Sequence, residues 1–126
     1  AGAIVGIKAV KVDVEVNVAG GGLGLFLVGL PDNAVKESEQ RIRSAFENSQ
    51  RRMTAKKVVV NLAPADLRKE GSGFDLAILM GILHSVGVIR RDVSLDDCCF
   101  VGELSLSGKI RPVSGVLSMV LASLIR

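Results

Sequence analysis

The chain has 126 residues, of which 48% are hydrophobic, and this is enough for one compact domain with its own core. Sixteen Lys and Arg residues against 13 Asp and Glu residues give a net charge of +3, which is too mild to indicate a dedicated nucleic-acid binder by itself. The longest apolar block, LAILMGIL, is far shorter than the roughly 20 residues of a membrane span, so we expect no membrane partner.

The cysteines and the two ends of the chain indicate the cellular compartment and the extent of the protein. Cys98 and Cys99 are adjacent, a spacing that suits neither a structural disulfide nor a zinc site. The N-terminal AGAIVGIKAV has no basic segment before an apolar run, so we predict no signal peptide and a cytoplasmic protein. The chain begins without Met and stops at VLASLIR in an uncapped helical pattern, so we expect a piece of a longer protein.

The first half of the chain predicts two strands and a helix. VKVDVEVNV (10–18) alternates valine with polar residues, which predicts a strand with one solvent-facing side. LFLVGL (25–30) predicts a second strand, and the glycines between the two predict a connection between antiparallel neighbours. Asp32 can cap the helix that follows. The apolar face of that helix is formed by Val35, Ile42, Ala45 and Phe46. The exposed face carries two i,i+4 ion pairs, Glu37/Arg41 and Glu39/Arg43.

The second half predicts a strand, a helix, a hairpin and a last helix. VVVNL (58–62) is typical of a central strand covered on both faces, and the almost wholly apolar segment 75–87 predicts a buried helix. Residues 100–113 predict a hairpin around Ser107-Gly108, and a last helix is predicted from Ser114. The order β-β-α-β-α-β-β-α predicts one α+β or two-layer α/β domain spanning residues 1–126.

The segment KEGSGFD raises three hypotheses for Ser72. As a nucleophile it needs a base, but His84 lies about three helical turns away, so these two residues cannot form a catalytic pair. As part of a capping box, its hydroxyl accepts from the Asp75 N–H while the Asp75 carboxylate accepts from the Ser72 N–H, at the start of the apolar helix. The local pattern favours the capping box.

The third hypothesis, a phosphate-binding loop, fails on spacing. The Walker A pattern needs glycine five residues before a Gly-Lys pair and Ser or Thr after it, whereas Gly108-Lys109 has Glu103 before it and Ile110 after it. The glycine-rich segment 19–24 leads into a strand and lacks the helix N-terminus that binds anions. No metal site is predicted either, because no second His or Cys stands three or four residues from His84.

Nucleic-acid contacts are predicted where basic residues cluster. The densest cluster is Arg51, Arg52, Lys56 and Lys57, and Arg90 and Arg91 form a second pair. The chain has no Trp or Tyr and only four Phe, so base stacking is left largely to residues that also serve the core. Any contact would therefore be to phosphates, independent of base sequence and sensitive to salt, and the alternative is that the cluster is a solvated loop.

Three stretches together resemble a known family. GLFLVGLPDNAVKESEQRIRSAFENS, VVVNLAPADLRKEGSGFDLAILMGIL and FVGELSLSGKIRPVSGVLSMVLA are similar to the N-terminal domain of the ComM/YifB family, the magnesium-chelatase-like AAA+ ATPases of bacteria. The resemblance extends over nearly the whole chain. It implies a fold like that of the Lon protease domain and of the second domain of a small-subunit ribosomal protein, with a mixed sheet and helices on one side.

The resemblance also permits a test for Lon-type peptidase chemistry. In the Lon-type motifs the nucleophile position falls on Gly73 and the lysine position on Leu117, so both members of the dyad are missing, and we predict no catalytic residue. A cryptic hydrolase would need a substitute lysine such as Lys69 or Lys109. The role of the loop residues Arg68, Lys69, Glu70, Ser72 and Asp75 stays open.

The family resemblance implies partners that lie outside these residues. The ATPase module would follow in the same chain and would hold ATP and Mg²⁺, so we expect no cofactor in this part. The resemblance implies a homo-oligomeric, hexameric motor on single-stranded or branched DNA, associated with DNA uptake and recombination. We expect a non-catalytic accessory domain, and the alternatives are a cryptic Lon-like hydrolase and a protein-binding module.

Overall fold

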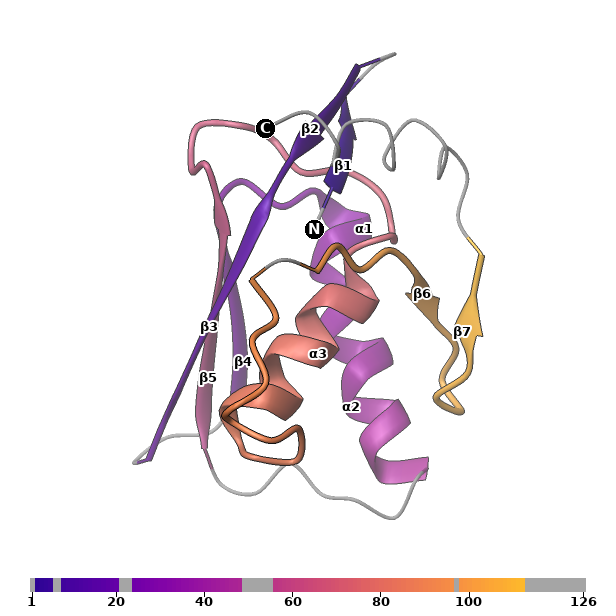
Figure 1. The fold of residues 1–126 in the computed structure, drawn as a ribbon. Helices are drawn as coiled ribbons and strands as arrows, with labels where there is room; N and C mark the ends of the chain where they lie inside the picture. Colours follow the sequence, from indigo (N-terminus) through magenta and orange to yellow (C-terminus); the bar gives the residue numbers. More distant parts are fainter. Residues whose placement is uncertain (1, 6–7, 21–23, 49–55, 97, 113–126) are drawn as a thin grey trace.

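The computed structural model describes residues 2–5, 8–20, 24–48, 56–96 and 98–112. Three groups of strands and three helices make up this part of the chain (Figure 1). The strands are β1 (Gly2–Val5), β2 (Lys8–Lys11), β3 (Asp13–Ala19), β4 (Gly24–Val28), β5 (Lys57–Ala63), β6 (Glu103–Leu104) and β7 (Ile110–Arg111). The helices are α1 (Asn33–Lys36), α2 (Ser38–Asn48) and α3 (Asp75–Ser85).

The central sheet is mixed and has the order β3-β5-β4. β3 runs antiparallel to β5, and β4 runs parallel to it. The predicted central position of the 58–62 strand is therefore confirmed. The prediction that the first two strands are direct neighbours is wrong, because β5 lies between them. The glycine-rich connection thus links the two outer strands of this sheet, a pairing that only long-range contacts could establish.

The helices cover one face of the sheet (Figure 1). Val12, Leu25, Val58, Val60 and Leu62 are buried on the helix side. They meet a second set of buried residues contributed by the helices, which comprises Val35, Ile42, Phe46, Ile78 and Ile82. The predicted α+β class, with helices on one side of a mixed sheet, is confirmed. On the opposite face of β5, Val59 and Asn61 are only half-buried, so the prediction of a strand covered on both faces is wrong.

The alternating N-terminal segment begins and ends differently from the prediction. Its first residues belong to β2, which pairs with β1 in a separate antiparallel hairpin, and β3 carries the regular alternation. The side chains of Asp13, Glu15 and Asn17 are exposed, as predicted for the solvent-facing side. The prediction of one continuous strand over 10–18 is wrong because Val12, fully buried, separates the two strands.

The first helical segment consists of two helices. Asp32 caps α1 as predicted, with its Oδ1 accepting from the Val35 N–H at 2.8 Å. Glu37 ends α1, and α2 begins one residue later. The two predicted ion pairs are present at 3.5 Å for Glu37–Arg41 and 3.0 Å for Glu39–Arg43.

The predicted hairpin is also present. β6 and β7 pair in antiparallel fashion, and Gly108 adopts a φ of 89° in the connecting turn. This hairpin contacts α2 and α3 on the side away from the sheet (Figure 1). The helix predicted from Ser114 lies outside the described residues. Within the described residues no helix is long and apolar enough to cross a membrane.

Candidate functional site

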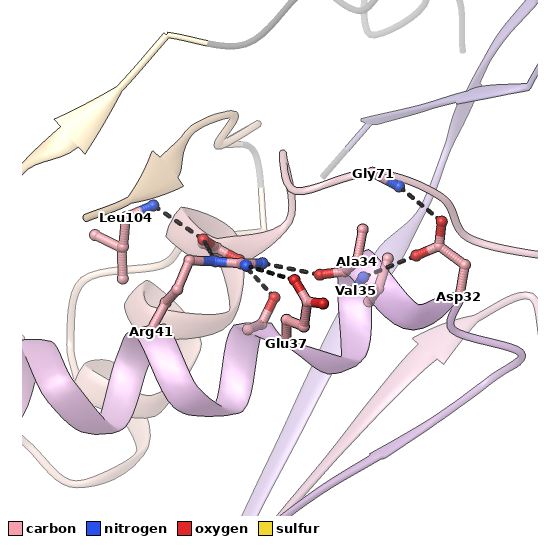
Figure 2. A network of polar contacts seen from close by, with 9 residues as sticks. Asp32, Ala34, Val35, Glu37, Arg41, Gly71 and Leu104 are labelled. Carbon is pink, nitrogen blue, oxygen red and sulfur yellow. Dashed lines mark hydrogen bonds and ion pairs between the residues drawn. The ribbon is translucent and has the colours of Figure 1, made fainter. Parts of the chain in front are cut away.

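The Asp75 carboxylate joins all three stretches that carry the family resemblance. Asp75 is fully buried at the start of α3, and its Oδ1 accepts from the Ser38 hydroxyl at 2.5 Å. Its Oδ2 accepts from Arg41 Nε at 2.5 Å and from the backbone N–H of Leu104 at 2.9 Å (Figure 2). A single carboxylate therefore holds α2, α3 and the β6–β7 hairpin together, and its charge is balanced by a guanidinium.

Arg41 completes this network from the helix side. Besides Asp75, it donates to the Ala34 carbonyl at 2.8 Å, across the junction of α1 and α2, and approaches Glu37 (Figure 2). The hydrogen bond to Asp75 raises the pKa of the Arg41 guanidinium above its usual value. The prediction that Arg41 lies on a solvent-exposed face is wrong, because only 14% of its side chain is exposed.

The capping-box prediction for Ser72 and Asp75 is wrong. The residue that caps α3 is Phe74, and no side chain makes a capping hydrogen bond there. The Asp75 N–H instead donates to the Ser72 backbone carbonyl at 3.4 Å, and the carboxylate serves the network described above. The physical reason is tertiary: a buried carboxylate gains more from a guanidinium than from one backbone N–H.

Lys69 is buried although nothing in its sequence setting separates it from its charged neighbours. Its Nζ donates to the Gly29 carbonyl at 2.7 Å and to the Pro64 carbonyl. Burial lowers the pKa of the Lys69 ammonium from its ordinary value. While it is protonated, the Lys69 ammonium has no lone pair with which to activate a neighbouring hydroxyl, and its N–H groups are directed at the Gly29 and Pro64 carbonyls.

The loop around Lys69 is fastened to the end of β4. The backbone N–H of Lys69 donates to the Leu30 carbonyl at 2.9 Å, and the backbone N–H of Asp32 donates to the Lys69 carbonyl at 2.8 Å. The second carboxylate oxygen of Asp32 accepts from the Gly71 N–H at 3.2 Å (Figure 2). The VGLPD and RKEGSGFD segments, distant in sequence, are thus bound to one another by backbone and side-chain hydrogen bonds.

The other charged residues of the motif loop face solvent. Arg68 and Glu70 form an exposed ion pair at 3.5 Å, a kind of contact that contributes little to stability. Ser72 is half-buried. Of the five loop residues of unknown role, Lys69 and Asp75 are therefore internal, whereas Arg68 and Glu70 are available to a partner.

The predicted basic cluster is partly described. Lys56 and Lys57 are exposed at the start of β5, and Arg51 and Arg52 lie outside the described residues. The Lys57 ammonium stands 5.5 Å from the centre of the Phe26 ring, within the range of a cation–π contact. In the second basic pair, Arg90 is matched by Asp92 at 2.5 Å, which reduces its attraction for phosphate.

A cleft of about 600 Å³ lies at the edge of β3 and beside α3. Its apolar lining includes Val14 and Leu95, and its charged residues are the carboxylates of Asp13, Glu15 and Asp96. The acidic lining disfavours a phosphate backbone. His84 lines a neighbouring hollow and its Nε2 is 2.7 Å from the Val93 carbonyl oxygen, while the described residues contain no group of three potential metal ligands.

The fold and the buried network define a small α+β domain whose distant motif stretches converge on one carboxylate. The family model described as subunit ChlI of Mg-chelatase matches residues 14–125. The chain is 47% identical over 122 residues to the competence protein ComM of Haemophilus influenzae and 44% identical over 116 residues to YifB of Escherichia coli. It is also 38% identical over 121 residues to a protein of Mycobacterium bovis. The chain belongs to the magnesium-chelatase ChlI family, as the sequence resemblance predicted.

These matches cover most of this chain and a small part of its relatives. They include 96% of the chain for the ComM match and 92% for the YifB match. The same alignments span only 24% and 23% of the two relatives. The chain therefore corresponds to about a quarter of the length of each of these proteins.

Proposed function

We propose that this chain is a non-catalytic accessory domain of a ComM/YifB-type ring ATPase that acts on DNA. The domain would guide DNA past the ring through basic residues at one end of its sheet. ATP and Mg²⁺ would be held by an ATPase module elsewhere in the same polypeptide. The parent protein would be a cytoplasmic homo-oligomer that moves single-stranded or branched DNA during uptake and recombination.

The observation that supports a non-catalytic role is the position of Lys69 and Asp75. Both are fully buried, and the polar side-chain atoms of both form hydrogen bonds within the protein. The segment that resembles a catalytic loop thus has a clear use in folding. A substitute lysine of a peptidase dyad would need to face a substrate, whereas Lys69 is buried.

The observation that favours DNA is the exposed pair Lys56 and Lys57. They stand at one end of the sheet, next to the link that carries Arg51 and Arg52, so up to four cations are close together in the chain. Contacts of this kind bind phosphate groups without reading bases and release counterions. A domain that passes DNA of any sequence needs this type of contact.

The experiment compares two double charge reversals in the full-length protein. Lys56→Glu with Lys57→Glu should weaken DNA binding at least tenfold and flatten the slope of log affinity against log salt by about 1.4 to 1.8, because each of the two lost phosphate contacts removes about 0.7 to 0.9. Arg90→Glu with Arg91→Glu changes the net charge equally and is the matched control. The guidance role is wrong if both variants bind DNA like the wild type, or if both lose the same affinity.

A further inference from the structure

The four phenylalanines of the chain have unequal roles in the structure. Phe46 and Phe74 are buried, and Phe100 is half-buried beside the acidic cleft. Phe26 is different, because 47% of it is exposed on the face of the sheet opposite the three described helices. An aromatic ring in this position contributes little to the core and is available to a ligand.

The local backbone gives the Phe26 ring its place. In β4, Leu25 points toward the helices and is buried, whereas Phe26 and Val28 point to the opposite face. Gly24 lies under the ring, since a Cβ atom there would come within 3.2 Å of it. The ring therefore leans along the strand toward the row that contains Lys57, whose ammonium is 5.5 Å from the ring centre.

Charge changes sign along this opposite face. At one end, Lys57 lies between Ala19 and Gly24 in the strand register. In the next row, Val59 lies between Asn17 and Phe26.

At the other end of the face the side chains are acidic. Asn61 lies between Glu15 and Val28, and Asp13 follows one row later opposite Ala63. Asn61 also donates to the Glu15 carboxylate at 3.1 Å. A polyanion can therefore approach the Phe26 end of the face and is repelled from the Asp13 end.

We propose that Phe26 is a stacking platform for a base of single-stranded DNA, with Lys56 and Lys57 binding the adjacent phosphates. This inference rests on the proposed function, and it assigns the preference of the domain for single-stranded over duplex DNA to one residue. An exposed aromatic ring beside cations is the combination with which proteins bind unpaired bases without reading their sequence. A duplex keeps its bases stacked inside the helix, so the ring would select single strands.

The test uses the full-length protein and two fluorescent probes, a 20-nucleotide oligo(dT) and a 20-base-pair duplex. Phe26→Leu should weaken oligo(dT) binding about tenfold and leave duplex binding within twofold, because only the stacked base is lost. Its salt slope should stay at the wild-type value, since no cation is removed. Phe26→Trp should keep or improve the single-strand affinity.

Val28→Ala is the matched control, because Val28 is exposed on the same face and strand but has no aromatic ring. It should bind both probes like the wild type. Since Phe26 is half exposed, the thermal midpoint of Phe26→Leu should shift by no more than about 3 °C, so that lost binding is not lost folding.

The outcomes separate this inference from the proposed function. If the wild type binds oligo(dT) and Phe26→Leu binds it equally well, the stacking role is overturned while DNA guidance stands. If the wild type binds neither probe at low salt, both are overturned. If Phe26→Leu and Val28→Ala alter the size of the oligomer without changing DNA affinity, the face packs against protein and the stacking role is overturned.

Discussion

The replacement of Asp75 by Asn tests whether one carboxylate ties the motif stretches together. The change keeps the shape of the side chain and removes its charge, so the largely buried guanidinium of Arg41 loses its closer counterion and keeps the exposed Glu37 at 3.5 Å. Asn also presents an NH₂ group where an oxygen now accepts from either the Ser38 hydroxyl or the Leu104 N–H. Removing one member of a buried ion pair costs about 3–5 kcal/mol, and the partial exposure of Arg41 argues for about 3 kcal/mol.

Urea denaturation measures this loss directly. With a slope of about 1.5–2 kcal/mol per molar urea, the midpoint of Asp75→Asn should fall by about 1.5–2 M. Ser72→Ala is the comparison that separates the network from a capping box. It should change the free energy of unfolding by no more than about 0.5 kcal/mol, since no side-chain cap is made at α3. Equal losses of about 1 kcal/mol in both variants would refute this reasoning and restore the capping box.

Two further predictions concern the loop contacts near β4. Gly29→Ala should lower the free energy of unfolding by more than about 2 kcal/mol, because a Cβ atom would lie 2.2 Å from the Leu62 carbonyl oxygen and φ is +106°. Gly71→Ala should lower it by only about 1 kcal/mol, because Gly71 has a φ of +87° but open space around it. Equal midpoints of the two variants in a thermal melt would contradict this difference. Lys69→Met should cost about 2 kcal/mol near neutral pH, because two backbone carbonyls lose their donor. The folded-state pKa of Lys69 is below the ordinary 10.5, so just below pH 10.5 the unfolded chain binds more protons than the folded one. The stability of the wild type relative to Lys69→Met should therefore increase as the pH rises toward 10.5. Urea titrations from pH 8 to 10.5 in which this stability difference stays constant or shrinks would contradict the burial of the ammonium.

Local sequence patterns predicted the elements whose environment is set by near neighbours. The alternation in 10–18 identified the solvent-facing side of β3, Asp32 was identified as a cap, and Ser107-Gly108 identified a hairpin turn. In each case the signal and the structure lie within a few residues of one another. The family resemblance supplied the mixed sheet with helices on one side, which the order of elements left open.

Most of the errors concern contacts between residues far apart in sequence. The position of β5 between β3 and β4 depends on pairing across more than 30 residues, and no local pattern encodes it. The i,i+4 spacing of Glu37 and Arg41 suggested a surface pair, although the stronger partner of Arg41 is Asp75 in another helix. A useful signal was present, because Ser38 lies on the same buried helix face as Ile42 and Ala45 and Arg41 borders that face.

The same reasoning applies to the candidate site. The basic cluster could be predicted from composition, but the selection of Phe26 among four phenylalanines required the sheet register. Sequence alone could not show that its ring lies beside Lys57, because 31 residues separate the two and only the parallel pairing of β4 with β5 brings them together.

The most direct measurement is the binding of fluorescent oligo(dT) by the 126-residue chain at several salt concentrations. If the domain guides DNA, it should bind at low salt and lose affinity steeply as salt rises, and Lys56→Glu with Lys57→Glu should flatten that dependence by the equivalent of two phosphate contacts. A folded domain that shows no binding even at low salt would contradict the central claim, and the DNA contacts would then belong to other parts of the longer protein.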